Sequence, residues 1–325
     1  MLSIALAAVL LWLSIRGVEW RRVERTIARA ELRYLAAALA ITLCSYFLRA
    51  VRWRILLNAG ASLKVATVFW ANMAGYLGNS FLPARAGEVI RSLLISSHSP
   101  LSRTYVLTTA LGERLMDAIA LVLWSSVVLM GVDAKPRWMN DLSRTMAVAA
   151  GAGALLVMVL PHAGTLVESI LGRLPAGPRL RGALLRLARE VLLGLRAFHD
   201  WGRFAGFVAL TVVVWTCDAW TTMAVARALG LSVSFTVAFL LLTGMGLGSA
   251  LPSTPGYVGI YQFVAVTVLA PFGIGRDDAL AYVLVLQAVG YVLVVACGIP
   301  GLHRWRAGER LIPSPGPPEA PPESR

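Results

Sequence analysis

Long runs of apolar residues, separated by short polar and basic segments, dominate the pattern of this chain. A membrane-spanning helix needs roughly 17–25 predominantly apolar residues. Runs of about this length, together with one shorter run near the start, cover residues 2–15, 35–57, 104–130, 144–161, 203–226 and 278–300. The pattern therefore predicts an all-α polytopic membrane protein with about six spanning helices.

Two further apolar regions, 64–97 and 235–272, are interrupted by closely spaced proline and glycine. SFLPARAG occurs at 80–87 and SALPSTPG at 249–256, so both interruptions follow the pattern S-x-L-P-x-x-x-G. Proline ends a helix and glycine permits a chain reversal. Non-helical backbone persists at membrane depth only where protein buries it or where it lines a cavity. Each motif therefore predicts a re-entrant helical hairpin with its tip at a cavity. The predicted cavity positions are Ser80, Pro83, Gly87, Ser249, Pro252 and Gly256.

The composition supports a membrane environment. Hydrophobic residues make up 58% of the chain and charged residues 14%, compared with about 25% charged residues in soluble domains. The formal net charge is +13, and arginine carries nearly all of it. Basic loops between apolar spans follow the positive-inside rule. We therefore expect the lipid bilayer as a partner and no nucleic acid.

The distribution of arginine also predicts an orientation. The positive-inside rule places the C-terminal tail and the basic stretch 165–202 on the cytoplasmic side of the inner membrane. The two hairpins then enter from opposite faces, as an inverted repeat of halves at about 35–130 and about 203–300. Such paired broken helices are typical of transporter binding sites. Segment 16–34 conflicts with this scheme because it is basic yet falls outside. Either it forms an amphipathic helix at the outer surface or the topology is wrong.

A single transmembrane domain is predicted over residues 1–310, followed by a Pro-rich tail, 311–325, that we expect to be disordered. The run at 2–15 lacks the basic start and cleavage site of a signal peptide, so it is interpreted as a short membrane helix. The stretch 165–202 places leucines at helical spacing among arginines. It forms either a helix on the cytoplasmic membrane surface against anionic lipid or a connecting helix packed on the bundle.

No pattern in the sequence predicts catalysis or a bound cofactor. The three cysteines lie inside apolar runs, and the four histidines are scattered without metal-ligand spacing. A Walker-type phosphate loop does not occur. We therefore expect that the protein is not an enzyme, holds no metal and needs no cofactor.

Three ionisable residues fall within the span predicted at 104–130. Glu113 and Asp117 are four residues apart and share a helix face, and Arg114 adjoins Asp117. Charges at membrane depth are energetically expensive and usually functional. The residues either take part in substrate binding or form structural ion pairs with arginines of the first hairpin, and the two roles are compatible.

Arg85, Glu88 and Arg91 follow the first interruption. An arginine fork suits a phosphate or carboxylate, and the start of a half-helix adds free backbone donors and a positive dipole end. We therefore expect the anionic headgroup of a lipid or lipid-linked substrate near Arg85, with help from Arg91 or Arg114. Membrane anchoring is the alternative role for Arg85. Replacing Arg85 by alanine is expected to abolish lipid movement while the protein still inserts.

Asp218 is a lone acid in the span predicted at 203–226, between Trp215 and Trp220. It takes a proton or cation during transport, or it pairs with an arginine. The sequence leaves both roles open.

Several motifs together resemble the lysylphosphatidylglycerol synthase transmembrane-region family, which is also called flippase-like. The stretch 79–88 (NSFLPARAGE) with Arg91 matches one family pattern. Further matches are Arg52-Trp53, Glu113-Arg114 with Asp117, and PGYVG at 255–259. The resemblance covers most of residues 1–300 and implies lipid translocation, as in the flippase part of the multiple peptide resistance factor. It does not imply aminoacyl transfer, which in those longer proteins belongs to a separate soluble domain.

Two positions depart from the family pattern. Many members carry Glu where this chain has Gln262 and Arg where it has Gln287. Losing both charges leaves no buried charge unpaired, whereas losing one alone would be strongly destabilising. Contact between the two glutamines is therefore predicted, and both are assigned to the binding region.

The sequence thus predicts a lipid flippase or lipid-binding transporter for an anionic or lipid-linked substrate. The alternative is a non-catalytic accessory subunit that partners an enzyme of envelope lipid or glycan synthesis. A membrane enzyme acting on lipid phosphates would need a clustered nucleophile and base or a metal site, and the sequence contains neither.

Overall fold

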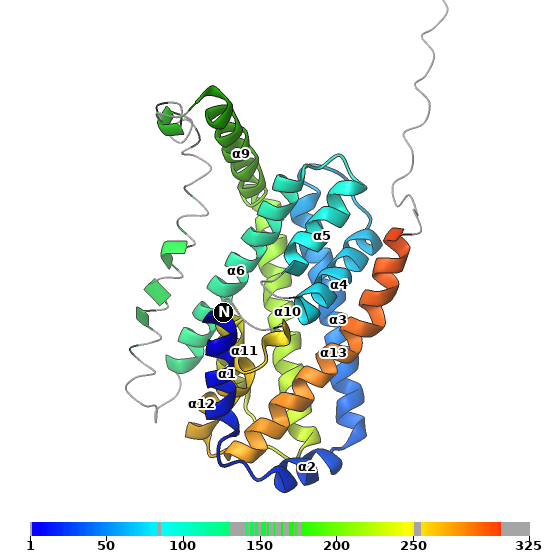
Figure 1. The fold of residues 1–325 in the computed structure, drawn as a ribbon, viewed down its shortest axis with the longest axis vertical. Coiled ribbons are helices and arrows are strands. Elements are labelled where there is room, and N and C mark those ends of the chain that lie inside the picture. Colours follow the sequence, from blue (N-terminus) through cyan, green and yellow to red (C-terminus); the bar gives the residue numbers. More distant parts are fainter. Residues whose placement is uncertain are drawn as a thin grey trace, which may run out of the picture.

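The computed structural model describes residues 2–82, 86–130, 177–249 and 255–306, with isolated positions between 141 and 173. All regular secondary structure in these ranges is helical (Figure 1). The first part of the chain forms α1 (Leu2–Ile15), α2 (Trp20–Ala28), α3 (Leu32–Leu57), α4 (Val65–Phe81), α5 (Ala86–Ser97) and α6 (Arg103–Met130). The second part forms α9 (Pro178–Arg196), α10 (Trp201–Ala228), α11 (Phe235–Gly248), η3 (Pro255–Tyr257), α12 (Ile260–Leu269), η4 (Ala270–Phe272) and α13 (Arg276–Arg306).

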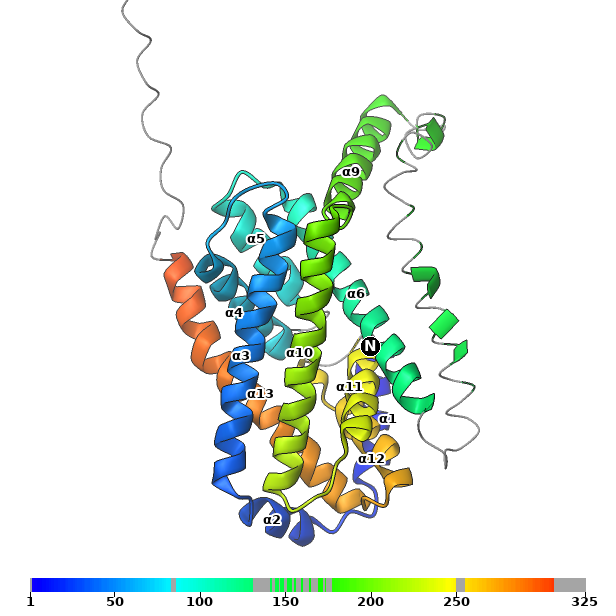
Figure 2. The same cartoon turned by 180° about the vertical axis from the view of Figure 1, so that it is seen from behind.

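Long helices run from one end of the molecule to the other. Figure 2 shows α3 and α10 side by side along their length, and they pack closely. Apolar residues form one core around α10 to α13 and another around the upper parts of α3, α4, α6 and α10. A polar layer lies between these two cores.

Two pairs of shorter helices enter this bundle from opposite ends. In Figure 1 the pair α4 and α5 occupies the upper half of the molecule, and the pair α11 and α12 occupies the lower half. The helices of each pair pack against each other, and α4 also packs against η3 at the tip of the second pair. Consequently the end of α4 and η3, which are far apart in sequence, lie together near the middle of the molecule.

Glycines allow the close approach within the first pair. A Cβ atom on Gly87 would collide with the backbone oxygen of Gly75, and one on Gly78 would lie 3.0 Å from the Gly87 Cα. The Asn79 side chain accepts a hydrogen bond from the Gly87 amide at 3.0 Å. This contact satisfies an amide in the first turn of α5, which has no partner within the helix.

The second tip depends on positive φ angles. Gly256 has φ 67° and Gly259 has φ 90°, and Tyr257 between them has φ 60°. Glycine adopts these conformations without strain. The positive φ at Gly259 lies directly before α12, so the PGYVG motif forms the turn that leads into α12.

Four helical segments in the described residues are long and apolar enough to cross a membrane: Leu32–Leu57, Trp201–Ala228, Pro255–Phe272 and Arg276–Trp305. Three match predicted spans, whereas Pro255–Phe272 falls in a region that was predicted as one half of a re-entrant hairpin. The helix α6 has sufficient length but carries four charged residues, and α1 is a shorter apolar helix. The predicted span 144–161 and the tail 311–325 lie outside the continuously described residues.

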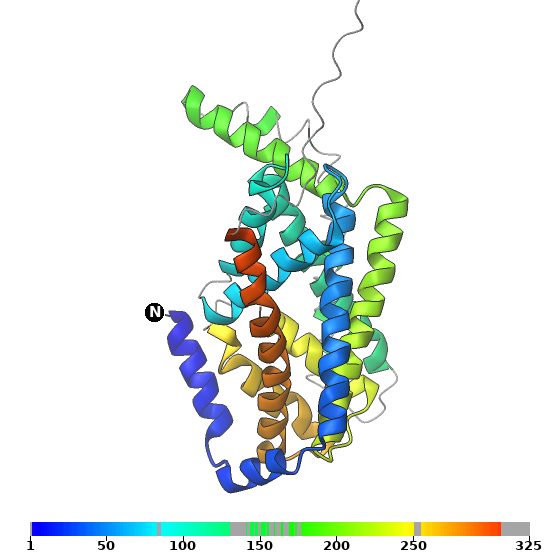
Figure 3. The same ribbon diagram turned by 90° about the vertical axis from the view of Figure 1, so that its right-hand side faces the viewer.

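The basic segment 16–34 contains the surface helix α2. It lies across the end of the molecule opposite α9 (Figure 1). Arg22 pairs with Asp278 at 2.8 Å, and the Glu19 amide donates to Asp277 at 3.1 Å, so α2 is attached to the start of α13. The helix α9 projects beyond the bundle at the other end, as Figure 3 shows.

Candidate functional site

Charged side chains from four helices meet in the polar layer between the two apolar cores. Among the described residues this charged cluster comprises Arg49 and Arg52 of α3, Glu88 and Arg91 of α5, Glu113, Arg114 and Asp117 of α6, and Asp218 of α10. Four are cations and four are anions, so in their ionised forms the charges balance. Such a balance is required because an unpaired buried charge is strongly destabilising.

Arg52 lies at the centre of the charged cluster and is fully buried. It donates to Asp117 at 2.6 and 2.9 Å and to Glu113 at 2.8 Å. The spacing of these two acids predicted a shared helix face, and the structure confirms it because both contact one guanidinium group. Arg52 also donates to the Thr211 hydroxyl at 3.1 Å, which ties α3 to both α6 and α10.

Arg91 joins the first hairpin to α6. It donates to Glu88 at 2.6 Å, to Glu113 at 3.0 Å and to Asn72 of α4 at 3.0 Å. Its guanidinium group lies 4.3 Å from the ring centre of Trp53, within the range of a cation–π contact. The structural ion pair between α6 and Arg91 that the sequence suggested is therefore present.

Arg114 and Arg49 are the two cations of the charged cluster that border open space. Arg114 donates to Glu88 at 2.9 Å, and its side chain is 30% exposed. Arg49 forms an ion pair with Asp218 and lies 3.9 Å from Asp117. Ser45 also donates to Asp218 at 2.6 Å. Of the two roles considered for Asp218, pairing with an arginine is observed, and proton or cation uptake remains a prediction.

A cavity of about 360 Å³ adjoins the charged cluster, and both hairpin tips contribute to its walls. The first tip supplies Asn79 and Ser80, and the second supplies Ser249 and Tyr257. A Cβ atom on Gly256 would lie 3.4 Å from the Ser80 carbonyl oxygen, which shows how closely the tips approach. The charged residues on its walls are Arg49, Glu88, Arg114, Asp117 and Asp218.

The two glutamines that depart from the family pattern touch each other. The Gln262 amide donates to the Gln287 side-chain oxygen at 2.7 Å, which confirms the predicted contact. Gln262 accepts from the Gly259 amide at 2.7 Å, and Gln287 donates to the Gly256 carbonyl at 3.1 Å. Tyr291 donates to the same carbonyl at 2.8 Å. This amide clamp, formed by Gln262, Gln287 and Tyr291, holds the second tip against α13.

Several predicted site residues occupy other positions. Arg85, Pro83 and Pro252 lie outside the described residues, so the headgroup contact assigned to Arg85 remains a prediction. Arg91 is 1% exposed and does not line the cavity, and its side chain instead contacts Glu88 and Glu113. Gly87 serves the close packing of α4 and α5.

Sequence reasoning missed Arg49 and Arg52 as members of the site. Arg52 was noted only as part of the Arg52-Trp53 family match, and Arg49 was not singled out. Their spacing indicates a shared surface, because residues three apart in a helix lie next to each other on one face. Two arginines on one face, inside the run predicted as a span, indicate partners in the bundle.

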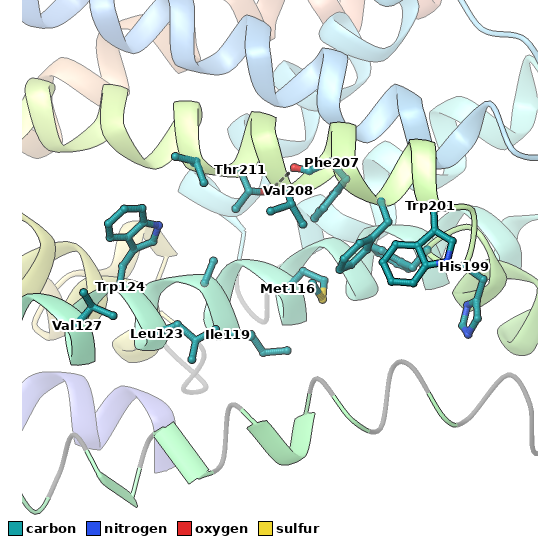
Figure 4. A pocket seen from close by; sticks show the side chains of 14 residues that line it. Met116, Ile119, Leu123, Trp124, Val127, His199, Trp201, Phe207, Val208 and Thr211 are labelled. Carbon is teal, nitrogen blue, oxygen red and sulfur yellow. Dashed lines mark hydrogen bonds between the residues drawn. The ribbon is translucent and has the colours of Figure 1, made fainter.

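An apolar groove lies on the other side of α6, between that helix and α10 (Figure 4). Its volume is about 870 Å³, and it is lined mainly by apolar residues such as Ile119, Leu123 and Val208. Thr211 lines the groove and also contacts Arg52, so the charged cluster separates the groove from the polar cavity. The groove suits a hydrocarbon chain and does not suit a polar headgroup.

Residues 1–298 match the family described as the lysylphosphatidylglycerol synthase TM region. The chain belongs to this family. The family match and the apolar helices together establish a membrane protein. No solved structure matches the chain significantly.

Curated relatives of this family member are distant. A UPF0104 membrane protein of Pyrococcus horikoshii is 22% identical, over 91% of this chain and 93% of the relative. One of Methanothermobacter thermautotrophicus is 22% identical over 85% of each chain. Glycosyltransferase AglD of Haloferax volcanii is 24% identical over 83% of this chain, but the match spans 48% of that longer protein. The chain therefore corresponds to about half of AglD.

Proposed function

We propose that this protein is a lipid flippase or lipid-binding transporter of the inner membrane, with an anionic or lipid-linked substrate and no catalytic activity of its own. The observation that carries this proposal is the polar cavity, with its charged cluster, where two broken helical hairpins meet inside a bundle of apolar helices. Charged groups and interrupted helices are energetically costly at membrane depth. Their presence at one place is best explained by a passage for a polar group.

The arrangement of the hairpins supports transport. Each pair enters from one end and stops near the middle, so we interpret them as re-entrant hairpins of an inverted repeat. In transporters of this kind the substrate binds between the repeats, and access alternates between the two faces. The end that carries α9 and the end of α13 is assigned to the cytoplasm because of its basic segments.

The charged cluster offers a physical basis for two states. Arg49 lies between Asp218 and Asp117, and Arg114 lies on Glu88 at the edge of the cavity. A headgroup that binds one of these side chains changes which ion pairs can persist. The lipid tail would remain in the bilayer or lie in the apolar groove, while the headgroup crosses through the cavity.

Lipid movement by purified protein in vesicles tests the proposal. Arg85→Ala should abolish movement while the protein still inserts, because the first tip loses its predicted headgroup ligand. Arg103→Ala is the matched control, since Arg103 is an exposed arginine at the start of α6. Movement should be measured as the fraction of labelled lipid that becomes accessible to a membrane-impermeant reagent. Equal movement by wild type and Arg85→Ala would refute the role of Arg85, and no movement by wild type would refute the flippase.

The similarity to AglD favours a second candidate function. That relative is named a glycosyltransferase and is about twice as long as the region it shares with this chain. A membrane module of this fold can therefore occur in one polypeptide with further sequence. In this alternative the protein is a non-catalytic accessory subunit that presents a lipid-linked substrate to an envelope-synthesis enzyme. Stable co-purification of such an enzyme, without lipid movement by the chain alone, would favour it.

A further inference from the structure

Hydroxyl groups on the wall of the polar cavity are oriented as acceptors. A serine or threonine hydroxyl has one hydrogen to donate and two lone pairs. Thr42 donates its hydrogen to the Ala38 carbonyl at 2.7 Å, and Ser80 donates to the Tyr76 carbonyl at 3.0 Å. Thr222 donates to the Ala219 carbonyl at 2.7 Å in the same way. Thr42 also lies 3.3 Å from the Thr221 hydroxyl, and either of these two can donate to the other. With their hydrogens used within the wall, these side chains present lone pairs to whatever binds there.

The charged groups of the cavity add further acceptors. Three carboxylates but only two arginines line it among the described residues. Both arginines already donate to carboxylates, Arg114 to Glu88 and Arg49 to Asp218. A carboxylate has about four lone-pair sites, so these acids retain acceptor capacity after pairing. Among these described wall residues the carboxylates outnumber the arginines, so the wall disfavours a purely anionic headgroup. A headgroup that both donates and accepts hydrogen bonds can use the carboxylate oxygens and the remaining arginine N–H groups.

Aromatic rings form another part of the wall. Tyr257 and Tyr261 stack with ring centres 5.0 Å apart, and Tyr46 and Tyr76 lie 5.3 Å apart. All four line the cavity. The face of an aromatic ring carries negative charge density, which attracts polarised C–H groups. A sugar ring offers such C–H groups on its faces and hydroxyl donors around its edge.

We propose that the headgroup held in this cavity is polyhydroxylated, as in a lipid-linked sugar. Its hydroxyl hydrogens bind the carboxylate and hydroxyl oxygens of the wall, and its ring packs against the tyrosines. The volume of about 360 Å³ is near the lower end for ligand pockets, so it accommodates a small headgroup and excludes the lipid tail. This inference rests on the proposed function and narrows its substrate class.

Native mass spectrometry of the full chain in detergent, titrated with defined lipids, tests the inference. The probes are monoglucosyl-diacylglycerol, phosphatidic acid and diacylglycerol, all with the same acyl chains. Wild type should bind the glucosyl lipid at least about tenfold more tightly than either of the others. The variant Thr42→Val/Ser80→Ala should lose about tenfold in affinity for the glucosyl lipid, because two acceptors are removed. Its affinity for phosphatidic acid should stay unchanged.

Thr67→Val is the matched control. Thr67 is a buried threonine of α4 that does not line the cavity, and its hydroxyl has no hydrogen-bond partner within the described residues. This variant should bind the glucosyl lipid as wild type does, and thermal unfolding should show that both variants are folded. Tighter binding of phosphatidic acid, or unchanged glucosyl-lipid binding by the cavity variant, would overturn the sugar assignment and leave lipid binding intact. If all three lipids bind equally weakly, the proposed function fails as well.

Discussion

At the scale of single residues, the central feature is Arg52, whose side chain is fully buried. Arg52 is held by two carboxylates on α6 and by a hydroxyl on α10. Each arginine in the charged cluster also faces an aromatic ring: Arg49 faces Trp215, Arg52 Phe207, Arg91 Trp53 and Arg114 Tyr76. These rings replace part of the hydration that a guanidinium group loses on burial. Carboxylates and aromatic rings of the protein therefore take the place of water around these charges.

Removing Arg52 should therefore destabilise the fold severely. Arg52→Met leaves Glu113 and Asp117 without their shared cation, at an expected cost of about 3–5 kcal/mol in the free energy of unfolding. Thermal or chemical unfolding in detergent measures the change. The double variant Arg52→Met/Asp117→Asn removes one cation and one anion and leaves Glu113 paired with Arg91, so it should recover much of the loss. A single variant as stable as wild type would contradict this account of the charged cluster.

The amide clamp makes a second prediction at this scale. Gln262 is 3% exposed, so Gln262→Glu places an uncompensated charge in the interior and should lower the free energy of unfolding by about 3 kcal/mol. Adding Gln287→Arg restores an ion pair at a distance that already permits a hydrogen bond. A double-mutant cycle should therefore give a favourable coupling energy of about 2 kcal/mol. Additive effects of the two substitutions would show that the side chains do not interact.

At the scale of elements, the hairpins depend on glycine contacts within each pair. The helices α4 and α5 approach so closely that the Gly75 and Gly87 backbones touch. This approach positions Asn79 to cap α5 and brings Asn72 of α4 within 3.0 Å of Arg91. The geometry of the first tip and the pairing in the charged cluster are thus coupled through a few small residues.

A methyl group at Gly87 should separate the two helices. We expect Gly87→Ala to lower the free energy of unfolding by about 1–3 kcal/mol, because the new Cβ meets rigid backbone rather than a flexible side chain. Gly182→Ala in α9 is the control, since a Cβ there meets nothing within 4 Å and alanine favours a helix over glycine. The control should be as stable as wild type or more stable. Equal stability of both variants would argue against the close packing.

The whole molecule places its charges in a layer between two apolar cores, with segments of different character at its two ends. The helix α9 and the end of α13 lie at one end, and α2 lies at the other (Figure 1). Both ends carry arginines, so the orientation assigned from basic segments needs a direct test. The position of α2 across one end matches the surface helix predicted as one alternative for segment 16–34, and its side of the membrane stays a prediction.

Cysteine labelling decides the orientation. In a background without Cys44, Cys217 and Cys297, Ser232→Cys lies in the loop after α10 and Gly177→Cys lies just before α9. A membrane-impermeant maleimide applied to spheroplasts should label Ser232→Cys and should reach Gly177→Cys only after permeabilisation. The reverse pattern would invert the topology. Labelling of both positions in intact spheroplasts would contradict a fixed spanning orientation.

Much of this architecture could be predicted from local patterns. Apolar run lengths predicted α3, α10 and α13, and the repeated motif predicted the two interruptions. The glutamine pair was predicted because a compensated loss of charge requires contact. Arg49 and Arg52 were not recognised as members of the charged cluster. A positive-inside argument counts charges without identifying the partner of each charge. Arg49 and Asp218 form an ion pair although they are 169 residues apart in sequence. No local pattern encodes a contact at that separation.

The amide clamp has a consequence for how the protein responds to its surroundings. Amides neither titrate in the physiological range nor carry a charge that salt can screen. Changes in acidity and ionic strength should therefore leave the hold of α13 on the second tip constant. The attachment of the second tip to α13 should thus be equally firm on both sides of a pH or ion gradient across the membrane.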